Sequence, residues 1–305
     1  MFEKILIPLD SSELAERALK PGLALAEQGN ADVFLVSVPF MEKAFIEDRA
    51  GYGFMLPDQS LAQSRKNLQA YLNKVKQNHA HPNVHIHPVV ADGDEASVIV
   101  DTAVREQVDL IVMSTHGRSG FSRWMLGSVT ERVLRQAPCP VLVIREDKPL
   151  QHMLITLDGS ELSETALQPG VEVAARLGSQ LTLFSVESSE ELNPTFVAEL
   201  EKVETGLGAR TIEDYYHRTE NYLQRLVARL PQEVAQVTDT APRVGPVTDT
   251  ILDFIEADKV DLVVMATHGR SGLQRWVYGS ITEKIMRSAK CAMLIVRPPS
   301  EKFTQ

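Results

Sequence analysis

Asp109-Leu-Ile-Val-Met-Ser114-Thr-His-Gly117-Arg-Ser-Gly120 recurs later in the chain as Asp261-Leu-Val-Val-Met-Ala266-Thr-His-Gly269-Arg-Ser-Gly272. The likeness continues to Gly127-Ser128 and Gly279-Ser280, and an opening stretch, Ile5 to Leu14, returns as Met153 to Leu162. Two repeats of this length indicate two domains rather than a solenoid of many short units. We predict one domain at residues 1–146 and another at 150–299, separated by a charged, proline-bearing linker.

Apolar runs and helical patterns alternate along each copy. In the first copy we expect strands at 5–9, 33–38, 84–90, 110–113 and 141–144, and helices at about 12–25, 60–77, 93–104 and 128–136. The stretches 39–59 and 187–212 differ between the copies and look like variable loops. Such alternation predicts an α/β fold in which each domain has a five-stranded, mostly parallel sheet with helices on both faces, as in Rossmann-like proteins.

Composition excludes several classes of protein. The chain has 305 residues, of which 44% are hydrophobic and 24% charged, which is enough for two ordinary cores. A net charge of -10 argues against a nucleic-acid binder. No apolar run is long enough for a membrane span or a signal peptide, so we expect a cytoplasmic protein. Cys139 and Cys291 occupy equivalent positions in the two copies, which argues against a disulfide or a metal site.

A candidate anion site follows the first and fourth strands of each copy. Ligands of open α/β sheets bind at the carboxyl ends of strands, where Asp10 and the segment from Ser114 to Ser128 lie. In that segment Gly117 precedes Gly127, which opens a helix. Glycine lets the backbone approach a phosphate closely, and a helix N-terminus supplies unpaired N–H donors. The pattern therefore predicts a phosphate site in each copy.

At these residues the chain resembles the universal stress protein family, whose ATP-binding members carry glycine, two residues, glycine, nine residues, then glycine with serine or threonine. The resemblance covers both halves and implies an adenine nucleotide alpha hydrolase-like fold, with ATP, ADP or AMP as the ligand and Mg²⁺ accompanying a triphosphate. It implies that an aspartate and a valine backbone face adenine and ribose, while the later residues hold the phosphates. The implied nucleotide-binding residues are Asp10, Val38, Met113, Ser114, Gly117, Gly127, Ser128 and Val129, and then Asp158, Val186, Met265, Ala266, Gly269, Gly279, Ser280 and Ile281.

Other interpretations of these residues remain open. Ser114 and Ala266 replace the first glycine of the family pattern, at the expected cost of some backbone freedom. Ser128-Val-Thr-Glu131 and Ser280-Ile-Thr-Glu283 also fit a capping box, which needs no ligand, and the aspartates could simply end strands. The glycine at fixed spacing after a buried strand, found twice, nevertheless favours a phosphate site.

The sequence favours binding over rapid turnover. It has no Gly-x-x-x-x-Gly-Lys-Ser/Thr loop, and no nucleophile accompanies His116 or His268, so we assign no catalytic residue and no metal ligand. We expect an ATP-binding, nucleotide-dependent switch or regulator of a stress response. A slow ATPase that uses one of these histidines, or an interaction module with vestigial nucleotide sites, stays open.

The closing strands of the two copies, 141–144 and 293–296, are short and apolar. In the family such strands pair between subunits. We expect the two copies to satisfy this pairing inside one chain as a pseudo-dimer, which leaves further homodimerisation open.

Overall fold

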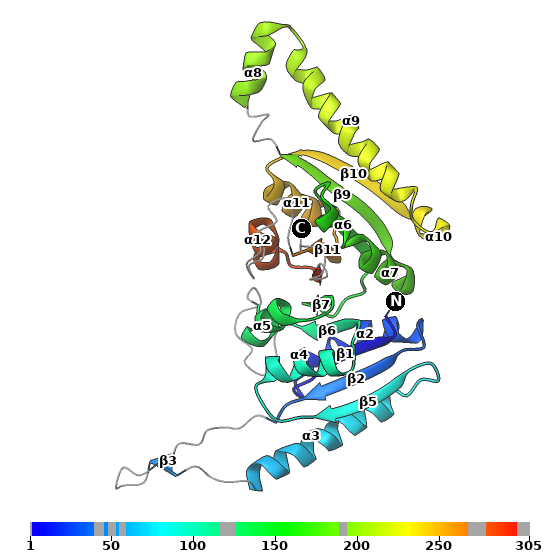
Figure 1. Ribbon diagram of the computed structural model, residues 1–305, viewed down its shortest axis with the longest axis vertical. Helices are drawn as coiled ribbons and strands as arrows, with labels where there is room; N and C mark the ends of the chain where they lie inside the picture. The colour runs from blue at the N-terminus through cyan, green and yellow to red at the C-terminus, as the bar shows by residue number, and fades with distance from the viewer. Residues whose placement is uncertain are drawn as a thin grey trace. The chain divides into compact units, whose positions relative to one another are not determined.

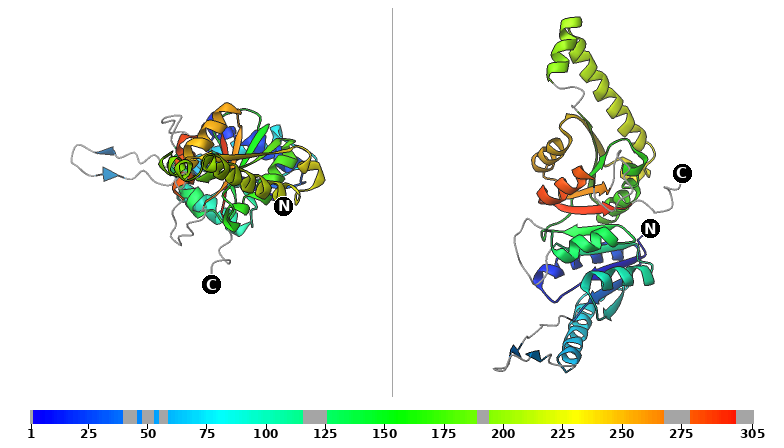
Figure 2. Two further views of the ribbon diagram at one scale, coloured as in Figure 1. Left: turned by 90° about the horizontal axis from the view of Figure 1, so that it is seen from above. Right: turned by 60° about the vertical axis from the view of Figure 1, so that its left-hand side comes forward.

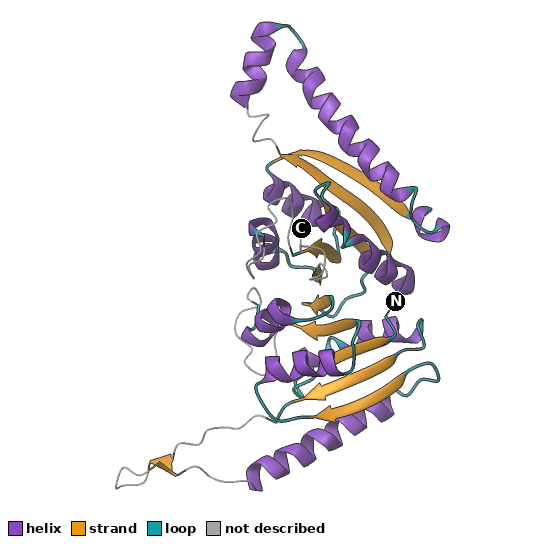
Figure 3. Ribbon diagram, in the orientation of Figure 1, coloured by secondary structure: helices purple, strands orange, loops and turns teal. Residues whose placement is uncertain are grey.

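A computed structural model describes residues 2–39, 46–47, 53–54, 59–115, 126–188, 194–267 and 279–297. These residues divide into two compact units. The N-terminal unit contains Phe2–Gly120 and Gly127–Pro138, and the C-terminal unit begins at Cys139. Each unit is built on a sheet with helices on both of its faces (Figures 1 and 3).

The N-terminal unit has a parallel sheet in the order β5-β2-β1-β6. Its strands are β1 (Lys4–Pro8), β2 (Asp32–Ser37), β5 (His85–Val90) and β6 (Leu110–Ser114). Its helices are α1 (Glu13–Glu16), α2 (Leu19–Glu27), α3 (Gln59–Asn78), α4 (Glu95–Arg105) and α5 (Ser128–Gln136). The pair β3 (Ile46–Glu47) and β4 (Gly53–Phe54) lies within the stretch expected to be an irregular loop. The strand order reverses between β1 and β6, which places the expected ligand position at their carboxyl ends.

The C-terminal unit repeats this plan, with the parallel order β10-β9-β8-β11-β12. Its strands are β7 (Val141–Ile144), β8 (His152–Leu157), β9 (Gln180–Ser188), β10 (Thr238–Gly245), β11 (Leu262–Ala266) and β12 (Ala292–Val296). Its helices are α6 (Glu161–Glu164), α7 (Leu167–Leu177), α8 (Pro194–Val203), α9 (Leu207–Val227), α10 (Gln232–Ala235), α11 (Val247–Ala257) and α12 (Ser280–Ser288). The predicted α/β fold of two repeated, mostly parallel domains is confirmed.

The expected first helix of each copy is two helices. Ser12 caps α1, since its side chain accepts a hydrogen bond from the Ala15 amide, but the helix ends at Glu16 and α2 begins at Leu19. Pro21 lies in the first turn of α2, where proline is tolerated because no amide donor is needed there. A continuous helix would put this proline in its interior, so the break follows from the sequence. Pro169 has the same place in α7.

The two closing strands pair as expected. Strand β7 runs antiparallel to β12, with Val141 opposite Ile295 and Val143 opposite Met293. Directly after β7, the buried guanidinium of Arg145 donates a hydrogen bond to the Met286 carbonyl in the last turn of α12. A cation at a helix C-terminus is favourable because the last carbonyl groups carry partial negative charge.

The stretch 187–212, expected to be a variable loop, is largely helical where the structure describes it. Helix α8 and the first part of α9 form a hairpin that extends beyond strands β9 and β10 (Figures 1 and 2). Gly208 of α9 allows the two helices to approach, because a Cβ there would lie 2.8 Å from a Val197 side-chain carbon. No helix among the described residues is both long and apolar enough to cross a membrane.

Candidate functional site

In the N-terminal unit, predicted binding residues from three strands lie at one edge of the sheet. Asp10 follows the end of β1, Val38 follows β2, and Ser114 is the last residue of β6. Strand β1 lies between β2 and β6, so the three positions are brought side by side. Asp10 and Val38 are half-buried, whereas Met113 and Ser114 are buried. This edge is the switch point of the sheet, where a ligand is expected.

Helix α5 begins beside this edge, and hydrogen bonds to backbone carbonyl groups at the end of β6 hold it there. The amide of Gly127 donates to the Thr115 carbonyl at 2.9 Å. The buried hydroxyl of Thr130 donates to the Ser114 carbonyl at 3.1 Å and lies 3.3 Å from the Thr115 carbonyl oxygen. A Cβ on Gly127 would lie 2.6 Å from the Thr115 oxygen. Glycine is therefore required here by close packing of two backbone segments.

The C-terminal unit repeats the arrangement with looser packing. The Gly279 amide donates to the Thr267 carbonyl at 2.9 Å, and the Thr282 hydroxyl donates to the Ala266 carbonyl at 3.1 Å. A Cβ on Gly279 would lie 3.6 Å from the Thr267 oxygen, which is ordinary van der Waals contact. With respect to the described residues, the glycine thus has a steric role in the N-terminal unit and not in the C-terminal unit.

The capping-box interpretation of Ser128 is wrong, and so is that of Ser280. In the structure Gly127 and Gly279 are the N-cap residues, and the serines are the first residues of α5 and α12. Within the described residues, neither helix receives a side-chain hydrogen bond at its N-cap. The first-turn amides have no partner inside the helix and point toward its N-terminal end, as an anion site requires.

The two aspartates are held in the same local turn. Oδ1 of Asp10 accepts from the Ser12 hydroxyl at 2.6 Å and from its amide at 3.0 Å. Asp158 receives the same two bonds from Ser160, at 2.6 and 3.0 Å. These bonds hold the carboxylate of Asp10 in a fixed orientation after β1, and that of Asp158 in the same orientation after β8.

In the C-terminal unit a pocket of about 160 Å³ adjoins Asp158. Ser185 and Glu187, which flank the buried Val186 in β9, line one part of it. Another part comes from α9, through Tyr215, Arg218, Thr219 and Tyr222. Sequence reasoning missed these α9 residues, although their helical spacing, which puts them on one face, was a usable signal.

A tyrosine on the long helix of each unit anchors that helix next to the site. Tyr71 donates to Glu16 at 2.8 Å, and Tyr222 donates to Glu164 at 3.3 Å. Burial raises the pKa of both hydroxyls above the usual tyrosine range, and the neighbouring glutamates add to the rise. Both tyrosines therefore stay protonated near neutral pH and act as hydrogen-bond donors.

Several predicted residues lie outside the described part of the chain. They are Gly117, Gly269, His116 and His268. The remaining site predictions fall on described residues, which lie at the carboxyl ends of strands or at the starts of α5 and α12.

Cys291 is not an activated nucleophile. Its side chain is buried, and burial raises the pKa of the thiol to about 11, even though the Arg145 guanidinium acts in the opposite direction. The thiolate is the reactive form of cysteine, so this side chain is inert near neutral pH.

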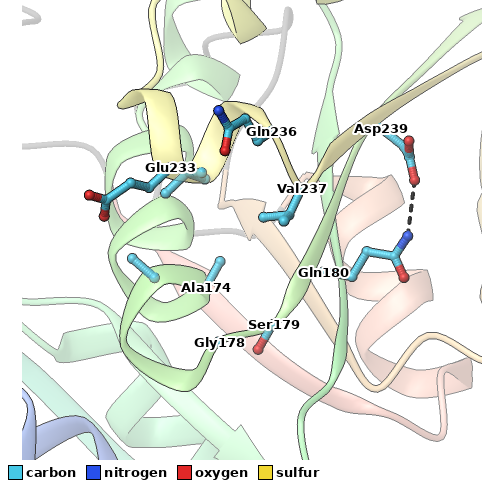
Figure 4. Close-up of a pocket in the computed structure, with 10 residues that line it drawn as sticks. Ala174, Gly178, Ser179, Gln180, Glu233, Gln236, Val237 and Asp239 are labelled. Carbon is cyan, nitrogen blue, oxygen red and sulfur yellow. Dashed lines mark hydrogen bonds between the residues drawn. The ribbon is translucent and has the colours of Figure 1, made fainter.

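A larger pocket, of about 640 Å³, lies at the opposite edge of the C-terminal sheet (Figure 4). It is formed by the end of α7, the start of β9 and the segment from α10 to β10, and it contains no predicted site residue. On one side of it, Gln180 of β9 donates a hydrogen bond to Asp239 of the neighbouring strand β10 at 3.0 Å. Pocket size alone therefore does not identify the candidate site, which is inferred from the strand order and from the position of the aspartates.

Thr130→Val should loosen α5 from the end of β6, because valine keeps the shape of threonine but removes the buried donor. We expect the free energy of unfolding of the N-terminal unit to fall by ~1–2 kcal/mol. The urea-induced unfolding transition of this unit measures the change. Ser128→Ala is the control, since Ser128 is exposed and should change stability by under about 0.5 kcal/mol. Equal stability of Thr130→Val and the wild type would show that the bond does not hold the helix.

A family model, curated relatives and a solved structure all relate this chain to universal stress proteins. The model of the universal stress protein family matches residues 1–145 and again 149–297. Universal stress protein MJ0531 of Methanocaldococcus jannaschii is 35% identical over 48% of this chain and 85% of its own length. Universal stress protein Rv2005c of Mycobacterium tuberculosis is 28% identical over 64% of this chain and 63% of its own length. The crystal structure of a universal stress protein from Archaeoglobus fulgidus has a TM-score of 0.65 at 19% identity, covering 97% of this chain and 99% of that one.

Proposed function

Because this chain belongs to the universal stress protein family over both of its halves, we propose that it binds ATP or another adenine nucleotide and acts as a nucleotide-dependent switch in a stress response. One observation carries the proposal. In each unit a glycine-capped helix starts at the carboxyl edge of the sheet, and no described side chain caps its first amides. Phosphate oxygens are suitable acceptors for such amides because the helix dipole adds partial positive charge.

The described residues offer hydrogen-bond partners both for the phosphates and for the nucleoside of a nucleotide. At the start of α5, the backbone amides around Gly127, Ser128 and Val129 would donate hydrogen bonds to phosphate oxygens. At the start of α12, those around Gly279, Ser280 and Ile281 would do the same. The fixed carboxylates of Asp10 and Asp158 would accept hydrogen bonds from the nucleoside. Mg²⁺ bound to a triphosphate would supply charge neutralisation. A nucleotide that binds only the folded state stabilises that state increasingly as its concentration rises above the dissociation constant, which is how a switch can respond to nucleotide level.

Equilibrium dialysis of the full chain with labelled ATP tests this proposal. We expect two ATP molecules per chain with dissociation constants in the micromolar range, and a higher unfolding temperature when ATP is present. Mass spectrometry of nucleotide released from gently purified protein would identify the natural ligand. Phosphate release measured in the same samples should be slow.

The two rival functions predict different results in these measurements. An ATPase would release phosphate steadily and lose this activity in His116→Ala while still binding ATP. An interaction module with vestigial sites would bind no ATP at micromolar concentration in either half, which would contradict the proposal.

A further inference from the structure

The long helix beside the site carries different residues in the two units. A contact that both units share identifies equivalent positions in α3 and α9, so the two helices can be compared residue by residue. Tyr71 of α3 donates a hydrogen bond to Glu16 of the short helix α1, and Tyr222 of α9 donates one to Glu164 of the short helix α6. The residues that follow them, Leu72 and Leu223, are both fully buried. These shared contacts identify Tyr71 and Tyr222 as equivalent positions.

From this anchor, the positions that wall the pocket can be compared. One turn before the shared tyrosine, Arg218 of α9 is equivalent to Asn67 of α3. Two turns before it, Tyr215 of α9 is equivalent to Ser64 of α3. The strands differ as well. Strand β8 pairs with β9 in the same register as β1 pairs with β2, which makes Glu187 of β9 equivalent to Pro39, after β2. At these equivalent described positions, the C-terminal unit therefore carries an aromatic ring, a guanidinium and a carboxylate where the N-terminal unit has Ser64, Asn67 and Pro39.

These side chains line the same pocket as Asp158. The Arg218 guanidinium carbon lies 4.3 Å from the centre of the Tyr215 ring, so the two planar groups form one cation–π pair on the pocket wall. Planar pairs of this kind accept the flat face of a heteroaromatic base. Glu187 and Asp158 add two carboxylates, which accept hydrogen bonds from hydroxyl or amino groups and repel phosphates. A purine nucleoside combines a flat base with such donors.

We infer that Tyr215, Arg218 and Glu187 form a nucleoside-recognition subsite in the C-terminal unit, so that this unit binds adenosine without needing its phosphates, whereas the N-terminal unit depends on the phosphates. The inference rests on the nucleotide binding proposed above. It gives the two units different ligand preferences: the N-terminal unit responds to the phosphorylation state of the nucleotide, and the C-terminal unit responds to the nucleoside.

Calorimetric titration of the full chain with adenosine and with ATP tests the subsite. The wild type should bind one adenosine and two ATP molecules. The double variant Tyr215→Ser/Arg218→Asn, which carries the residues of the N-terminal unit, should bind adenosine about tenfold or more weakly. Glu187→Gln should weaken adenosine binding severalfold, because it removes the charge from one acceptor.

The matched control is Ser64→Ala/Asn67→Ala at the equivalent positions of α3, which should leave adenosine affinity unchanged. Thermal unfolding followed by circular dichroism should show that all variants keep the wild-type fold, since each substituted side chain is exposed or half-buried and none is fully buried. Adenosine affinity within twofold of the wild type in the Tyr215→Ser/Arg218→Asn variant, or two ATP molecules bound with no adenosine, would overturn the subsite and leave the proposed function standing. Binding of neither ligand would overturn both.

Discussion

Gly127→Ala is expected to abolish nucleotide binding in the N-terminal unit, so that ATP stoichiometry falls from two to one per chain. The new Cβ would lie 2.6 Å from the Thr115 carbonyl oxygen, a distance that Cβ atoms essentially never adopt. That oxygen belongs to the backbone and already accepts from the Gly127 amide, so it cannot move aside without breaking the contact. Relief of the clash must displace the start of α5, where the phosphate-binding amides lie.

Gly279→Ala is the matched control, and it should keep both sites. Its Cβ would lie 3.6 Å from the Thr267 oxygen, and neither glycine has a positive φ, so alanine is allowed by the backbone at both positions. The difference between the two variants therefore isolates the steric effect. Titration with ATP measures it, and far-UV circular dichroism checks that both variants are folded. Equal loss of binding in both, or none in either, would show that the close contact does not control the site.

Phe184→Ala should destabilise the C-terminal unit by about 3–5 kcal/mol, the largest stability effect we predict. Phe184 is fully buried in β9, and its ring centre lies 4.6 Å from that of Phe254 on α11. Removal of the ring loses the apolar transfer energy and leaves a cavity between the sheet and the helix, because close-packed neighbours collapse only partly. Urea denaturation followed by circular dichroism measures the change in the free energy of unfolding.

Two further variants show whether the cavity is the cause. Phe184→Leu keeps most of the volume and should cost under about 1.5 kcal/mol. Val237→Ala removes an apolar side chain that is 51% exposed, and should change stability by under about 0.5 kcal/mol. If Phe184→Ala were as stable as either of these, the Phe184–Phe254 contact would not be part of the core of this unit.

Sequence patterns predicted the bounds of helices and strands well where neighbouring residues determine those bounds. The predicted helix 128–136 and strand 141–144 agree with α5 and β7 to the residue. The capping-box alternative at Ser128 fails for a local reason, because Ser-x-x-Glu fits both a cap and a first turn, and only the backbone geometry at Gly127 decides between them. The stretch 187–212 was expected to be a loop because it differs between the copies, yet variation in sequence does not exclude helix.

By itself, the sequence determined the repeat, the α/β fold and the positions that follow each strand, because the periods of buried strands and amphipathic helices are written along neighbouring residues. The tertiary structure alone decided which of two identical glycines is sterically required and which residues of α9 wall the pocket beside Asp158. Both depend on distances between segments far apart in the chain. The Thr115 carbonyl lies next to Gly127, and α9 lies beside Asp158 because it packs on β9 and β10 and is hydrogen-bonded to Glu164. A linear pattern contains no such distances, so these properties emerge only when the chain is folded.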